Sequence, residues 1–152
     1  MRAELVEILP LTPLPFILKG YLRRPAAAGP LPAVVLLPGC DAVVKPIDEN
    51  WGEKISSWGY VTLTVDSFSS RGIKGTCDRP APLEIAFDIY RGLNFLRQQG
   101  FVNPKRVVVV GIGQGGTLTL SAVERGIIEQ QAKNKFRAAV AFYPSAVLPK
   151  GS

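Results

Sequence analysis

The sequence predicts an α/β protein with a mostly parallel sheet of about six strands, helices on both faces and an N-terminal antiparallel hairpin. Short apolar runs without polar alternation, such as Ala33–Gly39 and Arg106–Gly111, are typical of parallel strands that helices cover on both faces. These runs alternate with one-sided helical patterns. This order is typical of βαβ units, whose crossover connections are right-handed.

The first elements are the hairpin and a central strand. Residues Ala3–Pro10 alternate weakly and end at proline, which predicts a strand, and Pro15–Pro25 is expected to be its antiparallel partner. After a Pro/Ala/Gly turn, Ala33–Gly39 is expected to be a central parallel strand. Residues Asp48–Trp58 then predict a helix, with Asp48 as its N-cap and a glycine directly after its end.

The second half of the chain repeats this alternation. Residues Tyr60–Asp66 predict the next strand, and the polar segment Ser67–Pro82 is a loop of a length that usually marks function or disorder. Apolar residues at intervals of three and four predict the later helices, and apolar runs predict the later strands. The remaining elements are helices Leu83–Gln99 and Thr117–Gln131 and buried strands Arg106–Gly111 and Ala138–Pro144.

The composition is that of one soluble globular domain, residues 1–152, because 47% of the chain is hydrophobic and 20% is charged. The formal charge is +6, but the cations are scattered, so we expect no nucleic-acid binding. The N-terminus lacks the pattern of a signal peptide, and no apolar run reaches the ~18 residues that a membrane span needs. We therefore expect a cytoplasmic protein that does not enter a membrane.

The two cysteines, Cys40 and Cys77, are too few for a disulfide framework, and their spacing matches no zinc site. We expect reduced thiols, as in most cytosolic proteins, while a pairing in the folded state stays open. The chain contains no histidine, so the usual general base and the commonest metal ligand are both missing. We expect neither a metal nor a cofactor.

The turn Gly111–Gly116 has two interpretations. Its G-x-G-x-x-G spacing after an apolar run matches a dinucleotide fingerprint. It also matches the nucleophile elbow G-x-S-x-G, with glycine in place of serine. A dinucleotide site should follow the first strand of a βαβ unit, with an acidic residue ending the second strand. The later strand ends in "AFYPS", which has no carboxylate, so nucleotide binding is the weaker alternative.

Four stretches resemble the dienelactone hydrolase family of α/β-hydrolases along nearly the whole chain. They are "PAVVLLPGC", "WGEKISSWGYVTLTVDSFSSRGIKGTCDRP", "AFDIYRGLNFLRQQGFVNPKRVVVVGIGQGG" and "FRAAVAFYPS", in the family's order. The resemblance places Gly113 at the nucleophile position. It places the backbone N–H groups of Cys40 and Gln114 in the oxyanion hole. It also matches Arg71 to a family arginine that could pair with a substrate carboxylate.

Two of these residues have further interpretations. Arg71 is equally well explained as a loop arginine that binds carbonyl groups or Asp78. Cys40 could act as a substitute nucleophile, but a buried structural thiol is the preferred interpretation because nothing lowers its pKa and no base is present.

The departures from the family pattern predict an inactive relative. Glycine replaces the nucleophile, and the acid and histidine of the family lie on later loops, so the fold is expected to be truncated on its C-terminal side. Amide donors without a nucleophile do not catalyse acyl transfer. We expect an inactive protein that binds a small carboxylate or ester-like ligand at Cys40, Gln114 and Arg71. The alternative is a hydrolase fragment or interaction module that another chain completes.

The last predicted strand suggests a partner. Residues Ala138–Tyr143 would form a sheet edge with unpaired amides, which tends to pair with another chain. We therefore expect a homo-oligomer, most simply a dimer, formed through this edge or the adjacent helices.

Overall fold

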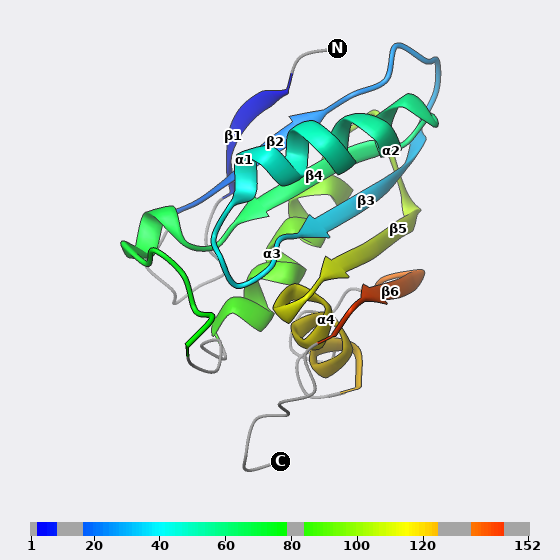
Figure 1. The fold of residues 1–152 in the computed structure, drawn as a ribbon. Coiled ribbons are helices and arrows are strands. Elements are labelled where there is room, and N and C mark those ends of the chain that lie inside the picture. Colours follow the sequence, from blue (N-terminus) through cyan, green and yellow to red (C-terminus); the bar gives the residue numbers. More distant parts are fainter. Residues whose placement is uncertain (1–2, 9–16, 79–83, 125–134, 145–152) are drawn as a thin grey trace.

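The computed structural model describes residues 3–8, 17–78, 84–124 and 135–144, and these form a six-stranded sheet in the order β1-β2-β4-β3-β5-β6 (Figure 1). The pairs β1–β2 and β2–β4 are antiparallel, and the other three pairs are parallel. The mostly parallel sheet with an N-terminal antiparallel hairpin is therefore confirmed. The strands are β1 Glu4–Ile8, β2 Leu18–Arg23, β3 Leu31–Leu37, β4 Val61–Asp66, β5 Val102–Ile112 and β6 Ala138–Phe142.

Helices cover both faces of the sheet (Figure 1). One face carries a helical segment made of α1 (Val44–Ile47), the π-helical turn η1 (Asp48–Gly52) and α2 (Glu53–Ser57), which contacts β4. The other face carries α3 (Glu84–Arg97), which contacts β3, β4 and β5, and α4 (Gln114–Glu124), which contacts β5 and β6. A 3₁₀ turn, η2 (Ser69–Arg71), follows β4.

The centre of the sheet is fully covered, as its apolar sequence predicts. Every residue of β4 is buried, and β3 is buried except at its second residue. The apolar stripe of α3 packs on these strands at Leu93 and Leu96. Gly92 allows a close approach, since a Cβ there would lie 3.2 Å from Val65 Cγ2. The sheet is thus a rigid platform for the loops at its carboxyl edge.

The first crossover helix begins earlier than its sequence pattern suggests. Helical structure starts at Val44, so the prediction of Asp48 as the N-cap is wrong. The Asp48 carboxylate is buried and accepts hydrogen bonds from Arg23 and Thr64. The Asp48 side chain, which was expected to cap the helix, therefore forms a tertiary ion pair that the sequence does not reveal.

One boundary and the burial of one strand also differ from the prediction. Helix α4 begins at Gln114 and not at Thr117, because the elbow turn leads directly into it. Strand β6 is not buried, since its residues alternate between exposed and half-buried at the sheet edge. Three predicted segments lie outside the described residues: the hairpin connection at 9–16, the end of the polar loop at 79–83 and the helix beyond Glu124.

Candidate functional site

A sharp strand–turn–helix connection lies at the carboxyl end of β5. Gly113 is the single residue between β5 and α4, and its φ of +59° lies in the left-handed region. The Gly113 N–H donates to the Phe142 carbonyl at 2.8 Å, and the Gly113 carbonyl accepts from Gly116 and Thr117 at 2.9 and 3.2 Å. This is the connection that a nucleophile elbow needs.

The glycines around this turn are required for different reasons. A Cβ on Gly111 would overlap the Gly115 carbonyl, and a Cβ on Gly115 would lie 2.8 Å from the Leu37 carbonyl oxygen. A Cβ on Gly113 would meet only Gly39 Cα within 4 Å, at 3.9 Å. Close backbone packing therefore explains the two flanking glycines. At Gly113, by contrast, the position of a Cβ is unobstructed.

The loop after β4, residues 67–78 as far as they are described, folds back onto Cys40. Cys40 and Cys77 form a disulfide with a Cα–Cα distance of 4.8 Å. The Thr76 N–H donates to the Cys40 carbonyl at 2.7 Å, and a Cβ on Gly75 would lie 3.0 Å from that carbonyl oxygen. The expectation of reduced thiols is wrong, because the folded loop brings together two cysteines that are 37 residues apart.

Gln114 contacts the same loop. Its Nε2 donates to the Thr76 carbonyl at 3.2 Å, and its Oε1 accepts a hydrogen bond from Thr76 Oγ1. Two of the three residues predicted for the site, Cys40 and Gln114, are therefore both joined to residues 75–77. We name these contacts, including the disulfide, the loop–elbow junction.

The third predicted residue, Arg71, is engaged by the protein itself. It donates to the Ser67 carbonyl at 2.8 Å and forms two hydrogen bonds with the Asp88 carboxylate, one of them 3.0 Å long. Its side chain is only 9% exposed, and that of Asp88 is fully buried. Asp88 thus supplies the kind of carboxylate that the family resemblance led us to expect from a substrate.

Sequence reasoning missed Asp88 and its second partner, Arg91. Arg91 lies one turn further along α3, 3.4 Å from Asp88, and also donates to the Ile8 carbonyl. Burial lowers the pKa of Arg91, and the attraction of Asp88 opposes that shift. The available signal was an Asp–Arg pair three residues apart beside the apolar stripe of a helix.

Comparisons with known proteins show to which family this chain belongs. The model of the dienelactone hydrolase family matches residues 18–151, which is most of the sequence. The chain belongs to the dienelactone hydrolase family. A comparison with curated proteins gave no match.

Solved structures of this and related hydrolases share the fold. A protein of Klebsiella pneumoniae assigned to the dienelactone hydrolases gives a TM-score of 0.77 at 20% identity, over 98% of this chain and 62% of that one. A dienelactone hydrolase-like promiscuous phosphotriesterase from metagenomic libraries gives 0.74 at 17%, over 99% and 62%. The α/β-hydrolase GrgF of Penicillium gives 0.73 at 22%, over 95% and 46%. The chain thus spans 62% or less of the length of these relatives.

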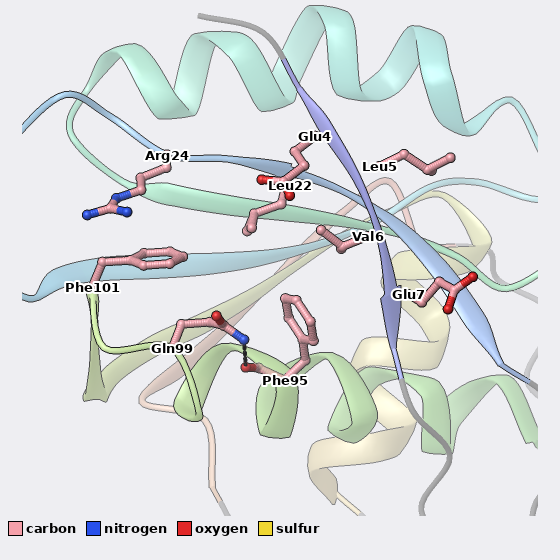
Figure 2. A pocket seen from close by; sticks show the side chains of 9 residues that line it. All are labelled: Glu4, Leu5, Val6, Glu7, Leu22, Arg24, Phe95, Gln99 and Phe101. Carbon is pink, nitrogen blue, oxygen red and sulfur yellow. Dashed lines mark hydrogen bonds between the residues drawn. The ribbon is translucent and has the colours of Figure 1, made fainter.

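A cavity of about 650 Å³ lies away from the elbow of this dienelactone hydrolase family member (Figure 2). It is formed by β1, the end of β2, the last turn of α3 and the residues before β5, at the opposite end of β5 from Gly113. The Arg24 guanidinium lies 4.2 Å from the centre of the Phe101 ring at its margin. The cavity contains none of the residues predicted for the site. Six of its lining residues are Glu4, Val6, Leu22, Arg24, Phe95 and Phe101.

No group of three or more His, Cys, Asp or Glu side chains among the described residues could hold a metal ion. No described helix is both long and apolar enough to cross a membrane.

Proposed function

We propose that this chain is a dienelactone hydrolase family protein without hydrolytic activity. The observation that carries the proposal is Gly113 at the elbow, where the family mechanism needs a side-chain nucleophile. The sequence also contains no histidine to activate a nucleophile or protonate a leaving group. Donors that stabilise an oxyanion have no effect on rate when no oxyanion forms.

We propose further that the elbow binds a small carboxylate or ester-like ligand. Support comes from the unobstructed Cβ position at Gly113 and from the family resemblance, which places the backbone N–H groups of Cys40 and Gln114 beside it. Arg71 already pairs with Asp88, so we assign it to holding the loop and assign recognition of the ligand to the amides. A screen of small carboxylates and esters by thermal shift tests this proposal, because a ligand that binds only the folded state raises the Tm. If no compound stabilises the protein, ligand binding at the elbow is refuted.

The test of inactivity is hydrolysis of an activated aryl ester and a small enol-lactone by highly purified protein. We expect no turnover above buffer. The control is a Cys40→Ala variant at equal concentration, measured with and without reductant, because reduction would free the Cys40 thiol. Turnover that disappears in this variant would show that Cys40 acts as the nucleophile, and the proposal of an inactive protein would fail.

A second candidate function, an interaction module, is favoured by the outer edge of β6. In the part of the chain that the structure describes, β5 is the only strand paired with β6. Val140 is 41% exposed and Phe142 is 47% exposed, and Phe142 stacks on the exposed Trp51. An open strand edge next to apolar side chains is suited to pairing with another strand. We propose that a second copy of this chain pairs there to form a homodimer.

Light scattering at tens of micromolar protein tests the dimer. The double variant Val140→Lys/Phe142→Lys should be monomeric, because charges at an edge strand oppose pairing. Trp58→Lys is the control, since Trp58 is an exposed aromatic residue at the C-cap of α2 and not on β6. A monomeric wild-type protein would refute the proposal.

Two alternatives have less support. A separate chain could supply an acid and a histidine, but Gly113 would still leave the elbow without a nucleophile. A dinucleotide site lacks its ribose-binding carboxylate, since no Asp or Glu follows Glu129 in the sequence. A cytoplasmic location stays a prediction, and the Cys40–Cys77 disulfide removes the argument for it that rested on free thiols.

A further inference from the structure

We propose that the Cys40–Cys77 disulfide is a thiol–disulfide exchange site, at which a small thiol such as glutathione modifies Cys77 and releases the loop after β4 from the elbow. The proposal concerns the disulfide and the loop alone. It holds whether or not the elbow binds a ligand or the chain has hydrolytic activity.

The two sulfur atoms belong to residues with different access to solvent. Cys77 and its neighbour Asp78 are exposed on the loop, whereas Cys40 is half-buried at the end of β3. Because exchange depends on which sulfur an attacking thiolate can reach, the exposed residue is the expected target. Lys74 and Asp78 lie three residues before and one residue after Cys77 and carry opposite charges, so access to the sulfur, and not local charge, selects the target.

The exchange step balances without an external oxidant. The thiolate of the small thiol attacks Cys77 Sγ, a new S–S bond forms, and the Cys40–Cys77 bond breaks. The electron pair of that bond leaves with Cys40 Sγ as a thiolate, which then takes a proton from water. The products are a mixed disulfide on Cys77 and a free thiol on Cys40.

The loop–elbow junction determines what the exchange changes. Before exchange, a covalent bond and three hydrogen bonds hold residues 75–77 against Cys40 and Gln114. All three hydrogen bonds involve Thr76, so after exchange the junction depends on a single residue. The modified loop should therefore detach from the elbow.

Two single-cysteine variants test the choice of sulfur. Cys40→Ser leaves only Cys77, and Cys77→Ser leaves only Cys40. With oxidised glutathione, followed by intact mass measurement, we expect the Cys40→Ser protein to gain a glutathionyl group several-fold faster. The difference should vanish in denaturant, where both thiols are equally accessible. Equal rates in the folded proteins, or faster modification of Cys40, would overturn the proposal.

Limited trypsin digestion of the wild-type chain tests release of the loop. Cleavage after Lys74 should be slow in the oxidised protein. It should become several-fold faster in protein with glutathione on Cys77, trapped by alkylation of Cys40. Thr76→Val in the oxidised protein removes the Thr76 hydroxyl but keeps the disulfide, so it should change the rate much less. Cleavage after Lys74 at the same rate in oxidised and modified protein would show that the disulfide does not hold the loop.

Discussion

Gly113 and Gly115 lie two positions apart in one turn, but different physical constraints act on them. Gly115 has backbone carbonyls of β3 and the residue after it where a Cβ would be placed, and backbone in the centre of a sheet cannot move aside. Gly113 has free space around it and a φ of +59°, so only its backbone conformation favours glycine. The elbow can therefore tolerate a side chain at Gly113 but not at Gly115.

Alanine substitutions should separate these two constraints. Gly115→Ala should lower the free energy of unfolding by about 2 to 3 kcal/mol through overpacking. Gly113→Ala should lower it by roughly 1 kcal/mol through backbone strain alone. Gly100→Ala is the control, since a Cβ there meets nothing within 4 Å and its φ is not positive. Urea denaturation measures all three, and equal losses at Gly113 and Gly115 would contradict the steric argument.

A cysteine at Gly113 should show whether the elbow is open. Both natural cysteines are in the disulfide, so Gly113→Cys would carry a single free thiol. We expect iodoacetamide to alkylate it stoichiometrically in the folded protein, because the position of its Cβ is unobstructed. An activated aryl ester should acylate it without sustained turnover, since no histidine is present to activate water. A thiol that reacts only in denaturant would mean that the loop after β4 covers the elbow.

At the scale of elements, a buried ion pair anchors the first crossover helix to the sheet. Asp48 in η1 accepts a hydrogen bond from Arg23 Nη2 of β2 at 3.0 Å and one from Thr64 of β4 at 3.1 Å. Both side chains of the ion pair are almost fully buried. Gly52 makes room for the carboxylate, since a Cβ there would lie 2.5 Å from Asp48 Oδ1. The position of the helix therefore depends on polar contacts as well as on apolar packing.

Removing one partner of this pair should be costly. Asp48→Ala removes the buried carboxylate that pairs with Arg23 and should lower the free energy of unfolding by about 3 to 5 kcal/mol. The combined variant Arg23→Met/Asp48→Leu/Thr64→Val replaces these three polar side chains with apolar ones and should recover most of that loss. Chemical denaturation of both proteins checks this prediction. If the combined variant is as unstable as Asp48→Ala, the stability of the fold depends on the packing of these side chains and not on their charges.

At the scale of the whole molecule, the disulfide connects the end of β3 to the loop after β4 across a chain separation of 37 residues. A cross-link stabilises a fold mainly by restricting the unfolded chain, and the effect grows with the length of the closed loop. The loop–elbow junction therefore contributes to global stability as well as to local order.

Loss of the cross-link should lower the free energy of unfolding by about 3 to 4 kcal/mol for a closed loop of this length. The urea midpoint of the wild-type protein should fall when reductant is added. A Cys40→Ser/Cys77→Ser variant should match the reduced protein and show no response to reductant. A wild-type midpoint that reductant leaves unchanged would indicate that the cross-link does not restrict the unfolded chain.

The sequence predicted the strands and the elbow well, because these features have local causes. Burial leaves a pattern within each segment, whichever segments pack against it. Examples are the continuous apolar runs of β3 and β5 and the helical spacing of Ile89, Leu93 and Leu96. Likewise, Gly111 and Gly115 reflect close backbone packing within one short turn, and Gly113 reflects its positive φ. The sequence by itself also determined that no histidine is present and that residue 113 is glycine.

Only the tertiary structure decided which polar groups meet. Asp88 pairs with Arg71 from 17 residues away, Arg23 with Asp48 from 25, and Cys40 with Cys77 from 37. No sequence pattern marks residues at these separations as partners, since loops of many lengths can bring two side chains together. For this reason the sequence identified Arg71 and Cys40 as candidate site residues, whereas only the folded chain showed that they bind Asp88 and Cys77.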